Sequence, residues 1–379
     1  MDQQREVRTA AGECPPELAR DLADAIGERR VLLDEATRNE VAGDATRHWG
    51  RPAVEREVLP WAVLRPESTE QVAAAVAVLN RWRTPIVPYG GGSGLMGGAI
   101  TARPGVVIDM REMGRVLEFS PQDRSVHVQA GAVLKGVNAM LEDRGFILGH
   151  DPWSLPVATV GGAISTNGLG YLAGRYGSMG EQVLGLTVVL ASGEVLRAPA
   201  LAKRSTGIDL KQLFLGAEGT MGVITEAVLK AFPRPEVRWL LSLAFPSFEA
   251  GFEAIQEVLA LGMRPAIADY GDHFEPASGL AFPRSGQPAG MAPVLQLVLD
   301  GFREEVAAQE QRLREVCQAH GGEDLGEDAA REFWAHRHDS GERFLESRLS
   351  GQRPQRSVNS AYEFLNMVVP ASRVLEYRR

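Results

Sequence analysis

Three stretches rich in glycine, serine and threonine have the residue types needed to bind a phosphate group. They cover residues 88–98, 158–170 and 216–224. Glycine lets backbone amides approach an anion closely, and serine and threonine hydroxyls can donate hydrogen bonds to it. A single stretch of this kind is usually a structural turn. Three of them, each next to a predicted strand, favour a binding site for a large ligand that carries phosphate.

The first stretch also satisfies a dinucleotide-binding pattern, since Gly92-Ser-Gly94-Leu-Met-Gly97 reads G-x-G-x-x-G. In a Rossmann fold, a helix follows these glycines and its amino end binds the pyrophosphate. Here Gly98 and Pro104 interrupt any helix, and Val106–Asp109 reads as a strand. The segment therefore predicts a cradle of backbone amides rather than a Rossmann helix.

Hydrophobic periodicity predicts the elements that carry these stretches. We expect helices at 16–26, 68–79, 132–144, 248–261, 304–319 and 328–349. Ser68 and Gln71 form a capping box at the start of the second of these helices. Strands are expected at 61–66, 84–90, 106–109, 114–119, 125–131, 223–229, 239–245, 264–270, 293–301 and 363–370, with a hairpin at 184–199 that turns at Ser192-Gly193. A Gly/Pro-rich loop covers 275–292.

Composition narrows the class of protein. The chain has 379 residues, of which 44% are hydrophobic, and its net charge is −9, so nucleic acid is not a favoured partner. Cys14 and Cys317 form no C-x-x-C unit, which argues against a disulfide scaffold and a thiolate metal site and fits a reducing cytosol. No apolar run approaches the ~20 residues that span a bilayer, and the amino-terminal residues do not form a signal peptide. We expect a cytoplasmic protein with no transmembrane segment.

Together, "PYGGGSG", "GHDPWSLPVATVGGAIST" and "LFLGAEGTMGVITEAVL" resemble the FAD-linked oxidase branch of the vanillyl-alcohol oxidase superfamily. The resemblance is strong over 58–235 and weak beyond. It implies an α+β fold: an N-terminal helical segment (1–56), a PCMH-type FAD-binding domain of two subdomains (57–235) and a ferredoxin-like α+β cap domain (236–379). The branch includes glycolate oxidase and D-lactate dehydrogenase flavoproteins, D-2-hydroxyglutarate dehydrogenase and alkylglycerone-phosphate synthase.

The resemblance also implies roles for individual residues. The FAD pyrophosphate would be wrapped by the first stretch, that is Pro88, Tyr89, Gly90, Gly91, Gly92, Ser93, Gly94 and Leu95. The diphosphate and isoalloxazine would be lined by Pro152, Ser154, Thr159, Gly161, Gly162, Ser165 and Thr166. The adenine-ribose side and the flavin edge would be held by Glu218, Gly219, Thr220, Gly222, Val223 and Ile224, although Glu218 can also be read as a solvated carboxylate.

The cofactor determines the expected reaction, because a flavin accepts a hydride while a base takes the hydroxyl proton. A 2-hydroxy acid substrate also needs a cation for its carboxylate, and arginine supplies a bidentate fork. Arg337 matches the W-x-x-R element of the 2-hydroxy-acid members, although an exposed helix arginine remains the alternative. The glycine loop has no histidine and His150 reads as structural, so we expect non-covalent FAD. His336 and His338 would face different sides of a helix, and no metal site is expected.

The catalytic residues remain unidentified at this stage. The histidine motifs that carry the family's general base are missing, and "VVPASRVLEYRR" resembles the strand before them. We therefore expect a C-terminally incomplete chain or half of a split protein, with the base beyond Arg379. The leading hypothesis is an oxidoreductase acting on a D-lactate-like or glycolate-like 2-hydroxy acid. The alternatives are an alkylglycerone-phosphate synthase-like transferase and a flavin-binding subunit without activity of its own, and a homodimer or a partner subunit is possible.

Overall fold

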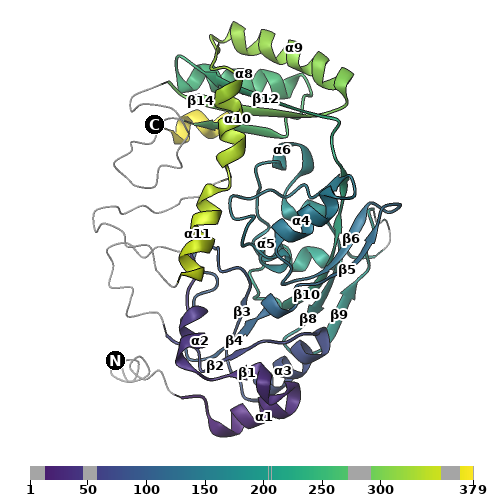
Figure 1. Cartoon of the computed structure of the whole chain (residues 1–379), viewed down its shortest axis with the longest axis vertical. Helices are drawn as coiled ribbons and strands as arrows, with labels where there is room; N and C mark the ends of the chain where they lie inside the picture. The colour runs from purple at the N-terminus through teal and green to yellow at the C-terminus, as the bar shows by residue number, and fades with distance from the viewer. Residues whose placement is uncertain are drawn as a thin grey trace, which may run out of the picture. The chain divides into compact units, whose positions relative to one another are not determined.

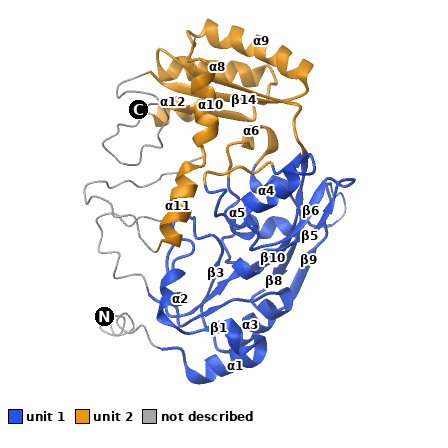
Figure 2. Ribbon diagram, in the orientation of Figure 1, with its two compact units in different colours: residues 1–148, 154–168, 178–232 blue, residues 149–153, 169–177, 233–379 orange. Residues whose placement is uncertain are grey.

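The protein is described from a computed structural model, which describes residues 13–45, 58–203, 205, 207–271, 292–350 and 368–378. The chain divides into two compact units, coloured separately in Figure 2. Unit 1 comprises residues 1–148, 154–168 and 178–232, and unit 2 comprises 149–153, 169–177 and 233–379. Unit 2 is therefore discontinuous, because two short loops from the first half of the chain belong to it.

Unit 1 contains a four-stranded sheet of order β1-β2-β4-β3. Its strands are β1 (Val31–Leu32), β2 (Ala62–Leu64), β3 (Ile86–Tyr89) and β4 (Val106–Asp109). Strands β2, β4 and β3 run parallel, and β1 is an antiparallel edge strand. Helix α3 (Thr69–Arg81) connects β2 to β3, which makes the β-α-β unit that the sequence predicts. The Ser68 side chain caps this helix by accepting from the amide of Gln71 at 3.3 Å.

Hydrophobic spacing explains how the first helix packs. Helix α1 (Pro16–Ile26) begins at a proline, which suits the first turn because that amide has no helical partner. It buries Leu18, Leu22 and Ile26, one residue per turn on a single face. Burying each of these side chains contributes roughly 1.5–3 kcal/mol. The same core cluster includes Val72 and Leu79 of α3, so the two helices share one hydrophobic interior.

A second, five-stranded sheet of unit 1 is antiparallel throughout and has the order β5-β6-β10-β8-β9. Its strands are β5 (Val116–Ser120), β6 (Ser125–Gln129), β8 (Val183–Val189), β9 (Val195–Ala198) and β10 (Val223–Lys230). The hairpin between β8 and β9 turns at Gly193, whose φ of +89° suits glycine. Up to residue 233, the other α-helices and short strands are α2 (Glu35–Glu40), α4 (Leu134–Glu142), β7 (Phe146–Ile147), α5 (Val160–Thr166), α6 (Ala173–Tyr176), α7 (Met179–Gln182) and β11 (Phe232–Pro233). Of these, α6 belongs to unit 2, and β7 pairs with β11.

Unit 2 is built on a four-stranded antiparallel sheet of order β13-β14-β12-β15. Its elements are β12 (Val237–Ala244), α8 (Phe248–Ala260), β13 (Ile267–Gly271), β14 (Val294–Gly301), α9 (Arg303–Ala319), β15 (Glu323–Asp324), α10 (Glu327–His336), α11 (Asp339–Leu349) and α12 (Val374–Tyr377). The first six of these elements follow the β-α-β-β-α-β order of a ferredoxin-like fold. The predicted α+β class and cap architecture are therefore confirmed.

The two faces of this sheet are covered by different helices. Leu241 of β12 and Leu297 of β14 lie opposite each other and pack under α8 and α9, with Leu313 fully buried in that layer. The other face carries Leu240 and Val298 and is covered by residues of α6 and α10 (Figure 1). No helix in the described ranges is both long and apolar enough to cross a membrane.

The structure differs from the sequence-based expectation at several elements. The single helix expected at 328–349 is two helices, α10 and α11, that break at Arg337 and His338. A short helix, α5, occupies part of the glycine-rich stretch 158–170, and a strand, β1, lies within the segment 1–56 that was expected to be helical. The expected strand at 363–370 and the expected loop at 275–292 lie almost wholly outside the described residues.

Candidate functional site

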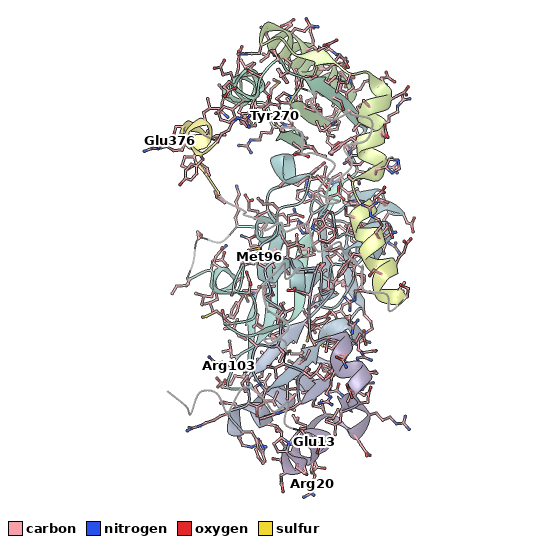
Figure 3. The ribbon with its side chains drawn as sticks, turned by 90° about the vertical axis from the view of Figure 1, so that its left-hand side faces the viewer. Glu13, Arg20, Met96, Arg103, Tyr270 and Glu376 are labelled. Carbon is pink, nitrogen blue, oxygen red and sulfur yellow. The ribbon has the colours of Figure 1, made fainter. Side chains whose placement is uncertain are left out.

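The loop that follows β3 is the first of the three glycine-rich stretches. Gly91 and Gly92 are buried, and Gly92 adopts a φ of +62° that side chains rarely tolerate. The chain then reaches β4 without forming a helix, as the sequence predicts. Met96 of this loop is 67% exposed and is labelled in Figure 3. The loop thus starts inside unit 1 and ends at its surface.

The second stretch lies directly against the first. A Cβ atom on Gly90 would be 2.3 Å from the hydroxyl oxygen of Thr159, and one on Gly91 would be 2.2 Å from the carbonyl oxygen of Val157. Both separations are too short for any side chain. Thr159 is itself buried, and its hydroxyl caps α5 by accepting from the amide of Gly162 at 3.4 Å. The glycines at 90 and 91 are therefore required for the two stretches to meet.

The third stretch joins both of the others. The amide of Gly216 donates to the carbonyl of Ile164 at 3.1 Å, and the amide of Glu218 donates to the carbonyl of Ser165 at 2.9 Å. A Cβ on Gly219 would be 2.9 Å from the ring of Pro88. The structure thus brings together, within unit 1, three stretches that are far apart in the sequence.

The three stretches present polar backbone around a shared region. Among the described residues, the amides of Gly92 to Gly98 donate no hydrogen bond to one another or to their neighbours. Two carboxylates lie beside this loop, because Asp44 would be 3.3 Å from a Cβ on Gly94 and Glu218 would be 2.7 Å from a Cβ on Gly98. Amides without protein partners suit an anion, and carboxylates suit hydroxyl groups of a sugar.

Several predicted site residues also make packing contacts or hydrogen bonds within the protein. Gly161 packs on Ala130, where a Cβ would be 2.8 Å from the alanine methyl, and Gly222 packs on the carbonyl of Val189. The hydroxyl groups of Thr166 and Thr220 donate to carbonyls of their own helix or turn.

The other predicted positions fall in two groups. Strand β10 pairs with β8 from Val223 onward but with β6 only from Glu226 onward, which leaves one backbone edge of Val223 and Ile224 without a strand partner. Ser154 is buried in unit 1, whereas Pro152 belongs to unit 2.

Unit 2 contains a cluster of ionisable side chains around Asp151. This carboxylate is 5% exposed and accepts from Arg337 Nε at 2.8 Å and from His338 Nε2 at 2.7 Å. Burial alone would raise the pKa of Asp151, but the hydrogen bond from His338 and the charge of Arg337 outweigh it and hold that pKa below its usual range. Asp151 is therefore a buried, ionised partner for two consecutive side chains.

Arg337 is held from three directions. Besides the bond to Asp151, its Nη1 donates to the carbonyl of Trp334 at 2.6 Å, and its guanidinium lies 3.5 Å from the centre of the Trp334 ring. Its side chain is 15% exposed, so Arg337 is not the exposed helix arginine that the sequence left open. His336, by contrast, pairs with Asp339 at the surface. Nowhere in the described ranges do three His, Cys, Asp or Glu side chains lie close enough to hold a metal ion.

A second buried carboxylate lies in the same unit. Asp300 of β14 accepts two hydrogen bonds from Arg238, its cross-strand neighbour on β12, at 2.7 and 2.6 Å. The hydroxyl of Tyr176 donates to the same carboxylate at 2.8 Å, and burial together with Asp300 raises the pKa of that hydroxyl. Arg238 also lies 4.5 Å from the Trp334 ring. Trp334 therefore contacts both arginines.

Comparison with known proteins identifies the family. The sequence model of the FAD binding domain matches residues 60–199, and that of the C-terminal domain of FAD linked oxidases matches residues 234–379. D-2-hydroxyglutarate dehydrogenase from Xanthomonas citri pv. viticola is 31% identical over 323 residues, which cover 78% of this chain and 67% of that protein. The chain belongs to the FAD-linked oxidase family.

Two further proteins are similar to this chain. Glycolate oxidase subunit GlcD of Bacillus subtilis is 31% identical over 68% of this chain and 55% of its own length. A solved structure of an alkyldihydroxyacetonephosphate synthase superposes with a TM-score of 0.74 at 22% identity, covering 88% of this chain and 65% of that one, which shows a shared fold. The chain thus spans little more than half of the glycolate oxidase subunit that it matches.

The cofactor of this FAD-linked oxidase is FAD, and unit 1 has the chemistry to hold it. A dinucleotide needs amide donors for its pyrophosphate and acceptors for its sugar hydroxyls. The loop 92–98 supplies the first, and Asp44 and Glu218 supply the second. Sequence patterns did not point to Asp44, because it lies more than forty residues before the loop that it contacts. They also missed Asp151, for which the only signal was the "HDP" at residues 150–152, and they weighed His338 only as a metal ligand.

Proposed function

We propose that the protein is an oxidoreductase that forms a 2-oxo acid from a 2-hydroxy acid: a hydride leaves the hydroxyl-bearing carbon for the flavin, and a base takes the hydroxyl proton. The observation that carries this proposal is Arg337, a cation confined by three contacts within unit 2. Two named relatives, a glycolate oxidase subunit and a D-2-hydroxyglutarate dehydrogenase, act on acids of this class by their names.

Different residues of the chain would bind the cofactor and orient the substrate. FAD, when bound, supplies the hydride acceptor. The amides of loop 92–98 would bind its pyrophosphate without a covalent bond to the protein. Arg337 would bind the substrate carboxylate, because its Nη2 makes no hydrogen bond to any described residue and can donate to an oxygen of the acid. A carboxylate that is held in one orientation also restricts the orientation of the hydroxyl-bearing carbon to which it is bonded.

An absorption spectrum and an anaerobic titration test this proposal. The purified protein should absorb near ~450 nm, and denaturation should release the flavin into solution. Adding D-lactate, glycolate or D-2-hydroxyglutarate without oxygen should bleach that band and yield the 2-oxo acid. Flavin that is retained but not reduced by any of these acids contradicts the proposed substrate class. Flavin that remains attached after denaturation contradicts non-covalent binding.

A further inference from the structure

Asp151 and the pair Arg337–His338 come from segments of the chain that are 186 residues apart. Asp151 lies in loop 149–153, whereas Arg337 and His338 form the break between helices α10 and α11. Both side chains bind the same carboxylate, each through one oxygen: Nε of Arg337 through Oδ2 and Nε2 of His338 through Oδ1. No oxygen of Asp151 is shared between them. The carboxylate therefore fixes both orientations at once.

The contacts of Arg337 leave a defined edge of its guanidinium unused. Nε is taken by Asp151, Nη1 donates to Trp334, and the flat face lies on the Trp334 ring. A free arginine side chain loses rotamer entropy when a ligand immobilises it. Here the protein has already restricted those rotamers before any ligand arrives. Such pre-organisation favours binding of a carboxylate at the remaining edge.

Asp151 also defines the hydrogen-bonding character of His338. An ionised carboxylate only accepts hydrogen bonds, so the Nε2 nitrogen that faces it must carry a proton. In the neutral imidazole this leaves Nδ1 as an acceptor. The ring of Tyr171 lies 6.4 Å from that of His338, and the Tyr171 hydroxyl donates to the backbone carbonyl of Arg337 at 3.2 Å. The backbone at the helix break is thereby held as well.

We propose that Asp151 is a positioning residue: it orients Arg337 for the substrate carboxylate and fixes the tautomer of His338. This inference rests on the proposed function for the role of Arg337. It assigns Asp151 no contact with the substrate. Its effect is transmitted through the two side chains that it holds.

Side-chain NMR of the flavin-loaded protein tests the positioning directly. Protein labelled with 15N in arginine and histidine should show a slowly exchanging Nε–H resonance for Arg337, assigned by its loss in Arg337→Lys. It should also show His338 as the Nε2–H tautomer. Both signatures should disappear in Asp151→Ala, which leaves neither oxygen, whereas Asn would keep one oxygen that can accept. Asp324→Ala is the matched control, because Asp324 also accepts from an arginine, Arg314, in unit 2. Signatures that persist in Asp151→Ala, or that are missing from the wild type, overturn the inference.

A double-mutant cycle then relates the positioning to substrate binding. Asp151→Ala should raise KM for the 2-hydroxy acid by on the order of tenfold to a hundredfold with a smaller change in kcat. Arg337→Lys should raise KM at least as much, and the double variant should resemble Arg337→Lys alone because both changes remove one interaction. Additive effects on KM overturn the coupling.

Failure of the proposed function has a separate signature. If no 2-hydroxy acid reduces the flavin of the wild-type protein, the proposed substrate class is refuted. If Arg337→Lys leaves KM unchanged, the role of Arg337 is refuted. Neither result alters the resonances of Arg337 and His338, which decide whether Asp151 positions them.

Discussion

His150 should make the stability of the protein depend on pH in the weakly acidic range. Its side chain is 3% exposed, and Nδ1 has no hydrogen-bond partner among the described residues. Burial lowers the pKa of His150 to about 4, against a smaller opposing effect of the Asp151 charge. In an unfolded chain a histidine has a pKa of about 6.5. Between these two values, the unfolded protein binds a proton that the folded protein does not.

The size of this effect follows from proton linkage. The folded pKa is the lower one, so the free energy of unfolding falls as pH drops from about 6.5 to about 4. The full difference in pKa corresponds to about 3 kcal/mol, and about 2 kcal/mol of it should be lost between about pH 7 and about pH 5. The lowered pKa of Asp151 acts at lower pH, since a carboxylate starts to lose its contribution only near its own unfolded pKa of about 4.

Urea denaturation at a series of pH values measures this loss. Unit 2 contains Trp153, Trp239 and Trp334, whose fluorescence reports its unfolding. His150→Gln cannot titrate, so its stability should change by about 2 kcal/mol less than that of the wild type over the same interval. The difference between the two proteins isolates His150 from every other titrating group. Equal pH dependence in both proteins would refute the buried, neutral histidine.

The remaining predictions concern the cradle and the core. Gly91→Ala should lose bound flavin, measured as absorbance per protein, because its methyl would lie 2.2 Å from a backbone oxygen. Gly136→Ala on α4, where no atom lies within 4 Å, should keep flavin, and equal flavin in both variants would count against the cradle. Arg238→Met leaves the buried Asp300 without its cation and should cost about 3–5 kcal/mol in urea denaturation. Adding Asp300→Leu should recover part of that loss, and no recovery would contradict the buried-charge explanation.

Local patterns predict the elements whose hydrophobic period is regular. The capped helix at Ser68 and the strands at 106–109 and 293–301 are found within a few residues of their expected bounds. These segments carry both their own end signals and one buried face, so local and tertiary preferences agree. The glycine stretches were also recognisable, because amides that approach an anion need residues without side chains.

Contacts between distant segments were not predictable in the same way. The break at Arg337 has no proline or glycine to mark it, and a continuous helix from 328 to 349 fits the sequence equally well. It is stabilised by Asp151, which lies 186 residues earlier in the chain. Helix α5 was missed because glycine has a low helix propensity, whereas Gly161 is required there to pack on Ala130. Tertiary packing decided both cases.

The discontinuity of unit 2 limits how this protein can be recombined. A chimera joined at residue 233 would take Arg238, Arg337 and His338 from one parent, but it would keep Asp151 and Tyr176 from the other. Arg337 and Asp300 would then face the residues that the other parent has in loops 149–153 and 169–177. Exchange of the cap therefore requires the transfer of three segments through five junctions rather than a single junction. Substitutions in the two loops and in the C-terminal half are accordingly expected to occur as matched pairs during evolution.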